Sequence, residues 1–270
     1  MPLAAPDIDF LRSFVAKQSG NVIRAGQGDL IETQLAPVVR DNGLTSIDQL
    51  VCKLRSPHSP LLASQVAQAV TINETSFFRD GHPFSVLRDL IIPNLIKLKG
   101  SQGIRIWCAA SSTGQEPLSI AMLVREFFPQ LTNLRIIATD LSEEVLAAAR
   151  KGTYSQLEVN RGLPVKDLVR FFHRQGNKWQ AKQELLDLIE YRQMNLTDRW
   201  VGMSSYDIVL IRNVLIYFEK AAKVEILKKV KQVLAPHGYL FMGSAETIIG
   251  LGIPFRREGN DGSIYYRHSS

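Results

Sequence analysis

The chain has 270 residues, 45% of them hydrophobic and 21% charged, which predicts an ordinary globular protein with one large domain or two smaller ones. No window approaches the roughly 18 consecutive apolar residues of a membrane-spanning helix, and the first residues lack the basic-then-apolar order of a signal peptide, so we expect a cytoplasmic protein with no direct membrane insertion. The net charge of +6 arises within residues 151–270, which carry 18 basic and 12 acidic side chains, and it favours an acidic partner and a solvated lysine face equally.

Residues 1–70 are predicted to form a small helical domain. Leu, Ile and Val recur there at spacings of three and four residues, and Gly20 and Gly43 interrupt the pattern. Cys52 in this part and Cys108 further along both lie in apolar surroundings. We therefore expect two free, buried thiols and no disulfide.

From residue 83 the pattern changes to alternating helices and strands. Residues 83–100 predict a helix that Pro93 bends or breaks. The apolar runs IRIWCAA and RIIATD predict strands, and each precedes a predicted helix, EPLSIAMLVREFF or SEEVLAAARKG. The second of these helices has Ser142 as its N-cap and ends at Gly152. Such units predict a parallel sheet covered on both faces.

Further strands are predicted at LIEYRQMN, YDIVLIRN and GYLFMGSAE, with a helix over residues 221–238 between the last two. SIYYRHS alternates enough to predict an antiparallel edge strand. Between residues 152 and 190 the alternation of strands and helices is interrupted. PVKDLVRFFHRQ predicts a helix, and GNKWQAKQ predicts a tight turn beside short strands. Insertions of this kind in such sheets often serve recognition.

Three polar turns follow predicted strands, where open parallel sheets bind their ligands. They are WCAASSTGQEPLS (Trp107 to Ser119), Asp140 after the second strand, and Ile211 to Asn213. Asp140 lies 26 residues after Gly114. An acid at this place is suited to accept both hydroxyls of a ribose, which indicates a nucleoside cofactor.

The single glycine of the first turn narrows the choice of cofactor. A dinucleotide favours Gly-x-Gly-x-x-Gly and a Walker loop needs Gly-Lys-Ser/Thr, whereas this turn has Gly114 alone. S-adenosylmethionine has a ribose, no phosphate, and an ammonium group that suits an acid such as Glu116. An equally good interpretation is that Glu116 complements the dipole of the helix beginning there.

The segment TINETSFFRD joins the two parts of the chain. It is polar and aromatic, so it is either part of a site or an interdomain linker anchored by its two phenylalanines. The candidate site residues in it are Asn73, Thr75 and Arg79.

A set of motifs occurs in one order along the chain: TINETSFFRD, WCAASSTGQEPLSIAM, IIATDLSEEVLAAARKGTY, MNL, DIVLIRNVLIYFE and GYLFMGSAE. As a set they resemble the chemotaxis receptor methyltransferase family, CheR, from about Asp9 to Tyr266. The resemblance implies an α/β fold: a helical N-terminal domain (1–70), a linker contributing to the active site (71–82), and a Rossmann-like methyltransferase domain (83–270) with a small antiparallel β-subdomain inserted at about 152–190.

The resemblance also implies an activity: methyl transfer from S-adenosylmethionine to glutamate side chains of chemoreceptors, which leaves S-adenosylhomocysteine and forms methyl esters for sensory adaptation. The implied partner is the cytoplasmic helical bundle of a chemoreceptor, with no nucleic acid partner, and nothing demands more than a monomer. Arg79 and Tyr217 are implied as catalytic residues. The implied cofactor contacts are Asn73, Thr75, Arg79, Glu116, Asp140, Asn195, Leu196, Arg212 and Asn213.

The sequence departs from the family pattern at three places. Gln115 and Leu118 stand where the family commonly has Glu and Tyr. The stretch LIETQLAPVVRDNGL retains only Arg40 of an arginine-rich helix, which argues against receptor docking by that helix. The turn in HRQGNKWQAKQ is short, which argues against binding of a receptor C-terminal pentapeptide.

Two other functions fit parts of the sequence. A nucleic-acid methyltransferase would suit the basic C-terminal half, but the turn IRNVLIYF lacks the prolines usual in enzymes that methylate exocyclic amines. A non-enzymatic adaptor would suit Gln115, but Arg79, Asp140, Asn213 and Tyr217 are retained. The five histidines are scattered, and we expect no metal site.

Overall fold

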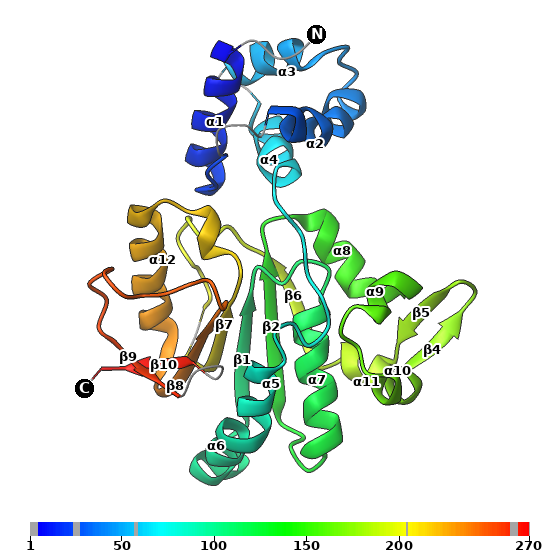
Figure 1. The fold of residues 1–270 in the computed structure, drawn as a ribbon, viewed down its shortest axis with the longest axis vertical. Helices are drawn as coiled ribbons and strands as arrows, with labels where there is room; N and C mark the ends of the chain where they lie inside the picture. Colours follow the sequence, from blue (N-terminus) through cyan, green and yellow to red (C-terminus); the bar gives the residue numbers. More distant parts are fainter. Residues whose placement is uncertain (1–4, 24–27, 57–58, 204, 260–263, 270) are drawn as a thin grey trace.

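The computed structural model describes residues 5–23, 28–56, 59–203, 205–259 and 264–269 (Figure 1). Within residues 1–70 the described chain is helical, and its buried side chains, from Leu11 to Val70, form a cluster of their own. This separate core supports the predicted boundary at residue 70, which stays a prediction. The helices are α1 (Ala5–Ser19), α2 (Gly28–Asp41), α3 (Ile47–Leu54) and α4 (Pro60–Ala69).

The second part is built on a seven-stranded sheet in the order β6-β2-β1-β7-β8-β10-β9. The first five strands in this order are parallel, while β10 pairs antiparallel with both β8 and β9. The strands are β1 (Ile104–Ala109), β2 (Leu134–Asp140), β6 (Ile189–Gln193), β7 (Tyr206–Ile211), β8 (Leu234–Met242), β9 (Phe255–Glu258) and β10 (Tyr265–His268).

Strand β1 shows why both faces of the sheet are covered. Ile106 and Cys108 point into one apolar cluster, and the alternate residues Trp107 and Ala109 point into another. The first cluster holds apolar side chains of α5 (His82–Val86), α6 (Ile92–Lys99) and α7 (Gln115–Phe127), and the second those of α12 (Lys220–Val233). The predicted Rossmann-like α/β fold with its helical N-terminal domain is confirmed.

The helix that begins at residue 82 is interrupted just before Pro93, as the sequence predicts. Leu87–Ile91 is a π-helical turn between α5 and α6, and the N–H of Ile92 reaches back to the carbonyl of Leu87. Pro93 has no N–H to continue the α-helical pattern, so the ladder shifts by one residue at this point.

The predicted inserted β-subdomain is present, but two of its elements differ from expectation. The predicted helix over residues 164–175 ends at Phe171, since Phe172–Gln175 is strand β4. The predicted tight turn GNKWQAKQ turns only at its start, because Lys178–Ala181 is strand β5 paired with β4. The subdomain also contains β3 (Thr153–Ser155), α9 (Gln156–Asn160), α10 (Val165–Phe171) and α11 (Gln183–Leu186), and it is preceded by α8 (Glu143–Lys151), which contacts β2 and β6.

Two further expectations are wrong. Strand β10 is not at the sheet edge, because β9, which the sequence did not reveal, pairs along its outer side. Cys52 is exposed, since it lies two residues from both Leu50 and Leu54, which form the buried stripe of α3. Cys108 is buried, and both thiols are free, as expected. No described helix is long and apolar enough to cross a membrane.

Candidate active site

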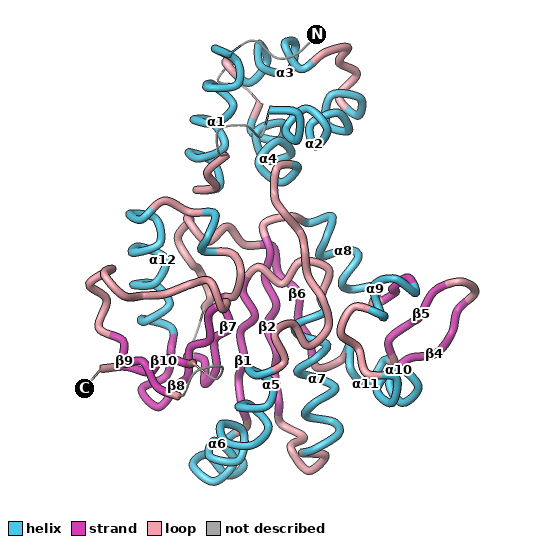
Figure 2. Tube along the Cα trace, in the orientation of Figure 1, coloured by secondary structure: helices cyan, strands magenta, loops and turns pink. Residues whose placement is uncertain are grey.

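The carboxyl ends of β1, β2 and β7 meet at one edge of the sheet, and the loops leaving them gather below the N-terminal helices (Figure 2). β1 and β7 are neighbours in the sheet, but the chain leaves β1 toward β2 on one side and leaves β7 toward β8 on the other, which makes this edge a topological switch point. A pocket with about 890 Å³ of empty volume, its open mouth included, lies here. Every residue predicted for the site lines it: Asn73, Thr75, Arg79, Glu116, Asp140, Asn195, Leu196, Arg212, Asn213 and Tyr217.

The loop after β1 is tightly folded. Ala110 and Ser112 have left-handed backbone with φ of 54° and 49°, and Gly114 follows with φ of 91°. A Cβ at Gly114 would lie 2.7 Å from the hydroxyl of Tyr191 and 3.0 Å from Cβ of Ala149. Gly114 is therefore required by its backbone conformation and by close packing, and no phosphate needs to be invoked for it.

Asp140 ends β2 with its side chain buried in the pocket wall. One carboxylate oxygen accepts from the N–H of Ser112 at 2.8 Å, and the other accepts from the N–H of Ser142 at 3.0 Å. Burial raises the pKa of Asp140 above its ordinary value, and these N–H donors offset part of that rise. The buried carboxylate keeps lone pairs to accept a ligand's hydroxyls, which suits a ribose.

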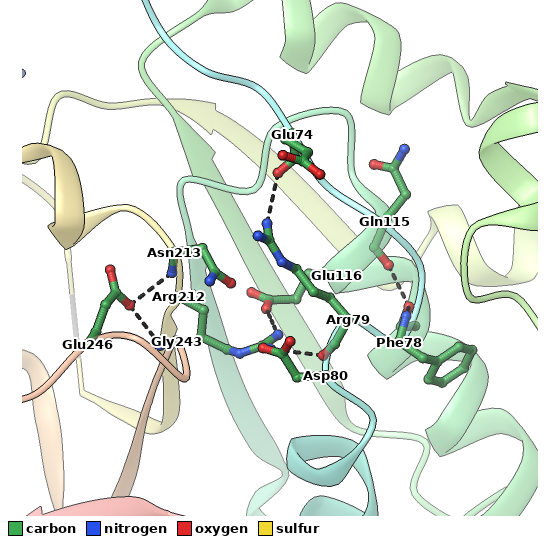
Figure 3. Close-up of polar contacts among 11 residues, drawn as sticks. Glu74, Phe78, Arg79, Asp80, Gln115, Glu116, Arg212, Asn213, Gly243 and Glu246 are labelled. Carbon is green, nitrogen blue, oxygen red and sulfur yellow. Dashed lines mark hydrogen bonds and ion pairs between the residues drawn. The ribbon is translucent and has the colours of Figure 1, made fainter. Parts of the chain in front are cut away.

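Glu116 lies in the first turn of α7 and pairs with Arg212 at 2.6 Å (Figure 3). The Arg212 side chain is only 2% exposed, and it also donates to the carboxylate of Asp80 and to the main-chain carbonyl of Arg79, both at 2.8 Å. Burial raises the pKa of Glu116, and the Arg212 guanidinium opposes that rise. Arg212 thus joins the linker to the turn after β1.

The linker is fixed against the inserted subdomain by Phe77, which is fully buried. Its ring packs edge-on against Tyr154 and Phe172, with centroid distances of 5.1 and 5.8 Å. Its N–H donates to the carbonyl of Arg161 at 3.2 Å, and a Cβ on Gly162 would lie 2.1 Å from its carbonyl oxygen. Only glycine permits this approach of the two segments.

Beyond this anchor the linker carries Arg79 toward the pocket. The guanidinium donates to the carbonyl of Glu74 at 2.9 Å (Figure 3), and the Glu74 side chain pairs with Arg161 of the subdomain at 2.8 Å. Phe78 and Asp80, on either side of Arg79, have left-handed backbone with φ of 47° and 68°. The segment therefore bends sharply on both sides of the cation.

Asn213 follows β7 and has left-handed backbone, with φ of 59°. Tyr217 closes a 3₁₀ turn, η3 (Leu215–Tyr217), on the same wall. The carboxylate of Glu246 accepts from the N–H of Asn213 at 2.9 Å, and this acid was not among the candidate residues predicted from the sequence. The signal available was the quoted motif GYLFMGSAE, whose final acid stands just after a sheet strand.

The N-terminal domain completes the pocket, which the sequence did not reveal either. Ser19 and Asn21 line it, and the N–H of Val22 donates to the carbonyl of Tyr217 at 2.8 Å. Asn195, which also lines the pocket, donates from its amide to the carbonyl of Gln18 at 2.8 Å. The end of α1 is thus hydrogen-bonded to two segments that carry candidate site residues.

The side chain of Gln115, the residue that departs from the family pattern, does not point into the pocket. It is 2% exposed, is not among the described residues lining the pocket, and accepts from the hydroxyl of Thr113 at 2.8 Å. Figure 3 shows its side chain directed away from Glu116. Among the described residues no group of three or more His, Cys, Asp or Glu side chains could hold a metal ion.

The residues that line the pocket match the chemical groups of the cofactor predicted from the sequence. The pocket wall offers two carboxylates, the buried Asp140 for a ribose diol and Glu116, whose side chain is 13% exposed, for an ammonium group. Apolar contact comes from Leu196, which is buried at the same wall. These groups fit S-adenosylmethionine.

Comparisons with known proteins agree with this choice of cofactor. The model of the "CheR methyltransferase, SAM binding domain" matches residues 73–261. The chain is 37% identical to chemotaxis protein methyltransferase 1 of Pseudomonas aeruginosa over 99% of both chains, and 37% identical to chemotaxis protein methyltransferase Cher2 of Pseudomonas putida over 91% of both. It is 36% identical to a chemotaxis protein methyltransferase of Vibrio parahaemolyticus, over 95% of this chain and 94% of that one.

Among solved structures, a plantazolicin methyltransferase in complex with S-adenosylhomocysteine is 12% identical, with a TM-score of 0.37 over 88% of this chain and 62% of its own; a similarity this low bears on neither substrate nor mechanism. The family match and the relatives carry the assignment. The chain is a methyltransferase that uses S-adenosylmethionine, and it belongs to the CheR methyltransferase family.

Proposed function

We propose that this enzyme methylates glutamate side chains in the cytoplasmic helical bundle of a chemoreceptor, forming glutamate methyl esters, and that it acts in the cytoplasm. The names of its relatives, all chemotaxis protein methyltransferases, support a place in chemotaxis. The observation that carries the choice of a carboxylate acceptor is the chemistry of the pocket wall. No His, Lys or Cys is among the described residues that line it.

This wall suits an acceptor that needs no deprotonation. A glutamate, with a reference pKa of about 4.3, is already ionised near neutral pH, whereas a lysine amine, with a reference pKa of about 10.4, must first lose a proton. The acids among the described residues of the wall are Glu74, Glu116 and Asp140. Glu74 pairs with Arg161, and Glu116 pairs with Arg212. The wall therefore has little to offer as a general base.

When bound, S-adenosylmethionine supplies a methyl group activated by its sulfonium. In the displacement a carboxylate oxygen forms the new bond to the methyl carbon, sulfur keeps the electron pair of the broken bond, and no proton moves. The protein has to align and desolvate the two reactants. We assign Tyr217 to orienting the acceptor carboxylate through its hydroxyl, and Arg79 to holding an anion at the pocket, either the acceptor or the carboxylate of the cofactor.

We further propose that Asn73, Thr75, Glu116, Asp140, Asn195, Leu196, Arg212 and Asn213 contribute to the cofactor site. For Arg212 the contacts favour an indirect part: its guanidinium is engaged by Glu116, Asp80 and the Arg79 carbonyl. It orients Glu116 and the bend of the linker.

The test is transfer of labelled methyl from S-adenosylmethionine to a panel of receptor cytoplasmic fragments. The modified residues are mapped, and mild base should release the label as methanol, because esters are labile where N-methyl groups are not. Base-stable label on lysine, or transfer to DNA in place of receptor fragments, would contradict the proposed acceptor.

The same assay tests Arg79. We expect Arg79→Ala to lower transfer at least about 100-fold, since it loses the cation that positions an anion, and to unfold at nearly the wild-type temperature. Arg256→Ala is the matched control, because Arg256 pairs with Glu258 on edge strand β9, away from the pocket. Near-normal transfer by Arg79→Ala would remove Arg79 from the site.

A further inference from the structure

Glu246 lies in the loop after β8 and binds three main-chain N–H groups with one carboxylate. One oxygen accepts from Asn213 at 2.9 Å and from Gly243 at 2.7 Å, and the other accepts from Ile216 at 3.2 Å (Figure 3 shows the first two contacts). Charge-assisted hydrogen bonds of this kind are about twice as strong as neutral ones. Glu246 is not among the described residues that line the pocket.

The contacts of Glu246 fall on the segment that holds two candidate site residues. Asn213 has φ of 59°, a left-handed conformation that non-glycine residues seldom adopt unless neighbouring groups stabilise it. Ile216 is the middle residue of η3, the turn that ends at Tyr217. A Cβ on Gly243 would lie 2.8 Å from both the main-chain and the side-chain nitrogen of Asn213. The two loops are therefore in close contact.

We propose that Glu246 is a positioning residue for methyl transfer. Its carboxylate holds Asn213 in left-handed backbone and fixes the η3 turn, so that Asn213 and Tyr217 keep their places at the pocket wall. Glu246 itself touches neither reactant. This inference rests on the proposed roles of Asn213 and Tyr217.

The chemistry makes a glutamine a poor replacement for Glu246, although the two side chains have the same shape. Both oxygens of Glu246 face N–H donors. In Glu246→Gln one of these oxygens becomes an NH₂ group, which places a donor against a donor. We expect either the Asn213 and Gly243 contacts or the Ile216 contact to be lost.

The experiment compares Glu246→Gln with Glu225→Gln, a matched control on the exposed face of α12, where Glu225 pairs with Lys228. We expect Glu246→Gln to lower kcat about 10- to 100-fold, the range for slight misplacement of a catalytic group, with folding retained. KM for the receptor fragment should stay within about threefold, because the lost interaction acts in the transition state. Glu225→Gln should leave both constants unchanged.

A double-mutant cycle with Tyr217→Phe separates positioning from a general loss of structure. If Glu246 acts through Tyr217, Glu246→Gln should cost clearly less in the Tyr217→Phe background than in the wild type. Equal costs in both backgrounds, or an unchanged kcat, would overturn the proposal.

Amide hydrogen exchange supplies a readout that needs no acceptor. Glu246→Gln should speed exchange in peptides covering residues 212–218 and leave the rest of the sheet protected. If the wild-type enzyme methylates no receptor fragment, the proposed substrate is wrong, and unchanged exchange at residues 212–218 would separately show that Glu246 does not order this turn.

Discussion

Glu116 and Asp140 are carboxylates that are largely removed from solvent and have different hydrogen-bond partners. Glu116 faces a guanidinium that is itself buried, whereas Asp140 faces main-chain N–H groups. Burial raises the pKa of both acids, so neither set of partners fully offsets the free-energy cost of removing the carboxylate from water. Carboxylates in this condition gain from a cationic or hydroxyl-rich ligand, which is what the cofactor offers.

Glu116 and Gln115 are adjacent in sequence and are expected to respond very differently to substitution. Glu116→Ala should weaken binding of S-adenosylmethionine at least tenfold, about 1.4 kcal/mol, because the ammonium loses its acid. Gln115→Glu should change affinity little, since that side chain is buried away from the pocket beside Thr113. Isothermal titration calorimetry on both variants checks the order, and the reverse order would show that the wrong residue of the pair was assigned.

Binding of the cofactor should also depend on pH through these two acids. Their pKa values lie above the ordinary values of glutamate and aspartate, so as pH falls they take up protons earlier than exposed carboxyls do, and the cofactor dissociation constant should then rise. The sign for folding is opposite. Because folding raises both pKa values, unfolding releases protons, and the contribution to stability declines as pH rises through the ordinary values toward the raised ones.

Calorimetry between pH 4 and 8 checks this dependence. Glu116→Gln should flatten the acidic part of the profile, although its overall affinity is lower. A wild-type affinity that is constant down to the ordinary carboxyl range would contradict the role given to burial.

At the scale of single residues, the sequence predicted the site residues that stand in local motifs. It did not predict the side-chain pairs that form between segments far apart in the chain. All of the predicted site residues line one pocket, because each stands in a motif at a strand end or in the linker. The linker's Asp80 acquires its partner Arg212 across 132 positions, and Glu246 reaches Asn213 across 33. No periodicity or spacing encodes such pairs.

At the scale of elements, the loops around the pocket are held in strained conformations. The non-glycine residues with left-handed backbone in the described chain are Phe78, Asp80, Ala110, Ser112 and Asn213. All of them lie in the linker or in loops at the pocket edge. Strain of this kind persists when neighbouring structure enforces it, and it clusters at functional sites. The linker conformation is held near its middle by the aromatic anchor Phe77 and near its end by Arg212, which pairs with Asp80.

The anchor can be tested directly. Phe77→Ala should lower the free energy of unfolding by about 3–5 kcal/mol, the usual cost of removing a buried Phe ring, and should weaken cofactor binding because the linker loses its fixed path. Phe127→Ala is the matched control: that ring is 42% exposed at the end of α7, and its loss should cost within about 1 kcal/mol. Denaturant unfolding and calorimetry measure the two effects.

Unchanged cofactor affinity in a folded Phe77→Ala protein would show that the linker does not depend on its anchor.

The sequence showed this anchor only as a pair of phenylalanines in TINETSFFRD. Whether that segment was part of a site or an interdomain linker stayed open. Strand β9 was missed, and the bounds of β4 and β5 were misplaced, for a related reason. Each is four residues long, and its conformation is set by pairing with a neighbour and not by its own pattern.

At the scale of the whole molecule, the N-terminal domain is part of the pocket wall. The backbone of Asn21 forms an isolated antiparallel bridge with Phe218, next to Tyr217. Helix α4 also reaches the methyltransferase domain, where Gln68 accepts from the N–H of Glu143 at 3.1 Å. Because Ser19 and Asn21 line the cofactor pocket, the docking of this domain fixes one part of the pocket wall.

Gly20 is the point at which this docking is most sensitive to a single methyl group. A Cβ there would lie 2.7 Å from the side chains of both Phe218 and Thr197, and its φ of 75° disfavours any other residue. Gly43→Ala provides the control, because Gly43 has a similar φ of 65° but open space around the position of a Cβ. The two variants carry comparable backbone strain, and only Gly20→Ala adds a clash between domains. We expect Gly20→Ala to weaken binding of S-adenosylmethionine several-fold more than Gly43→Ala does, with faster hydrogen exchange at residues 214–218. Equal affinities in the two variants would show that the N-terminal domain does not help to close the pocket.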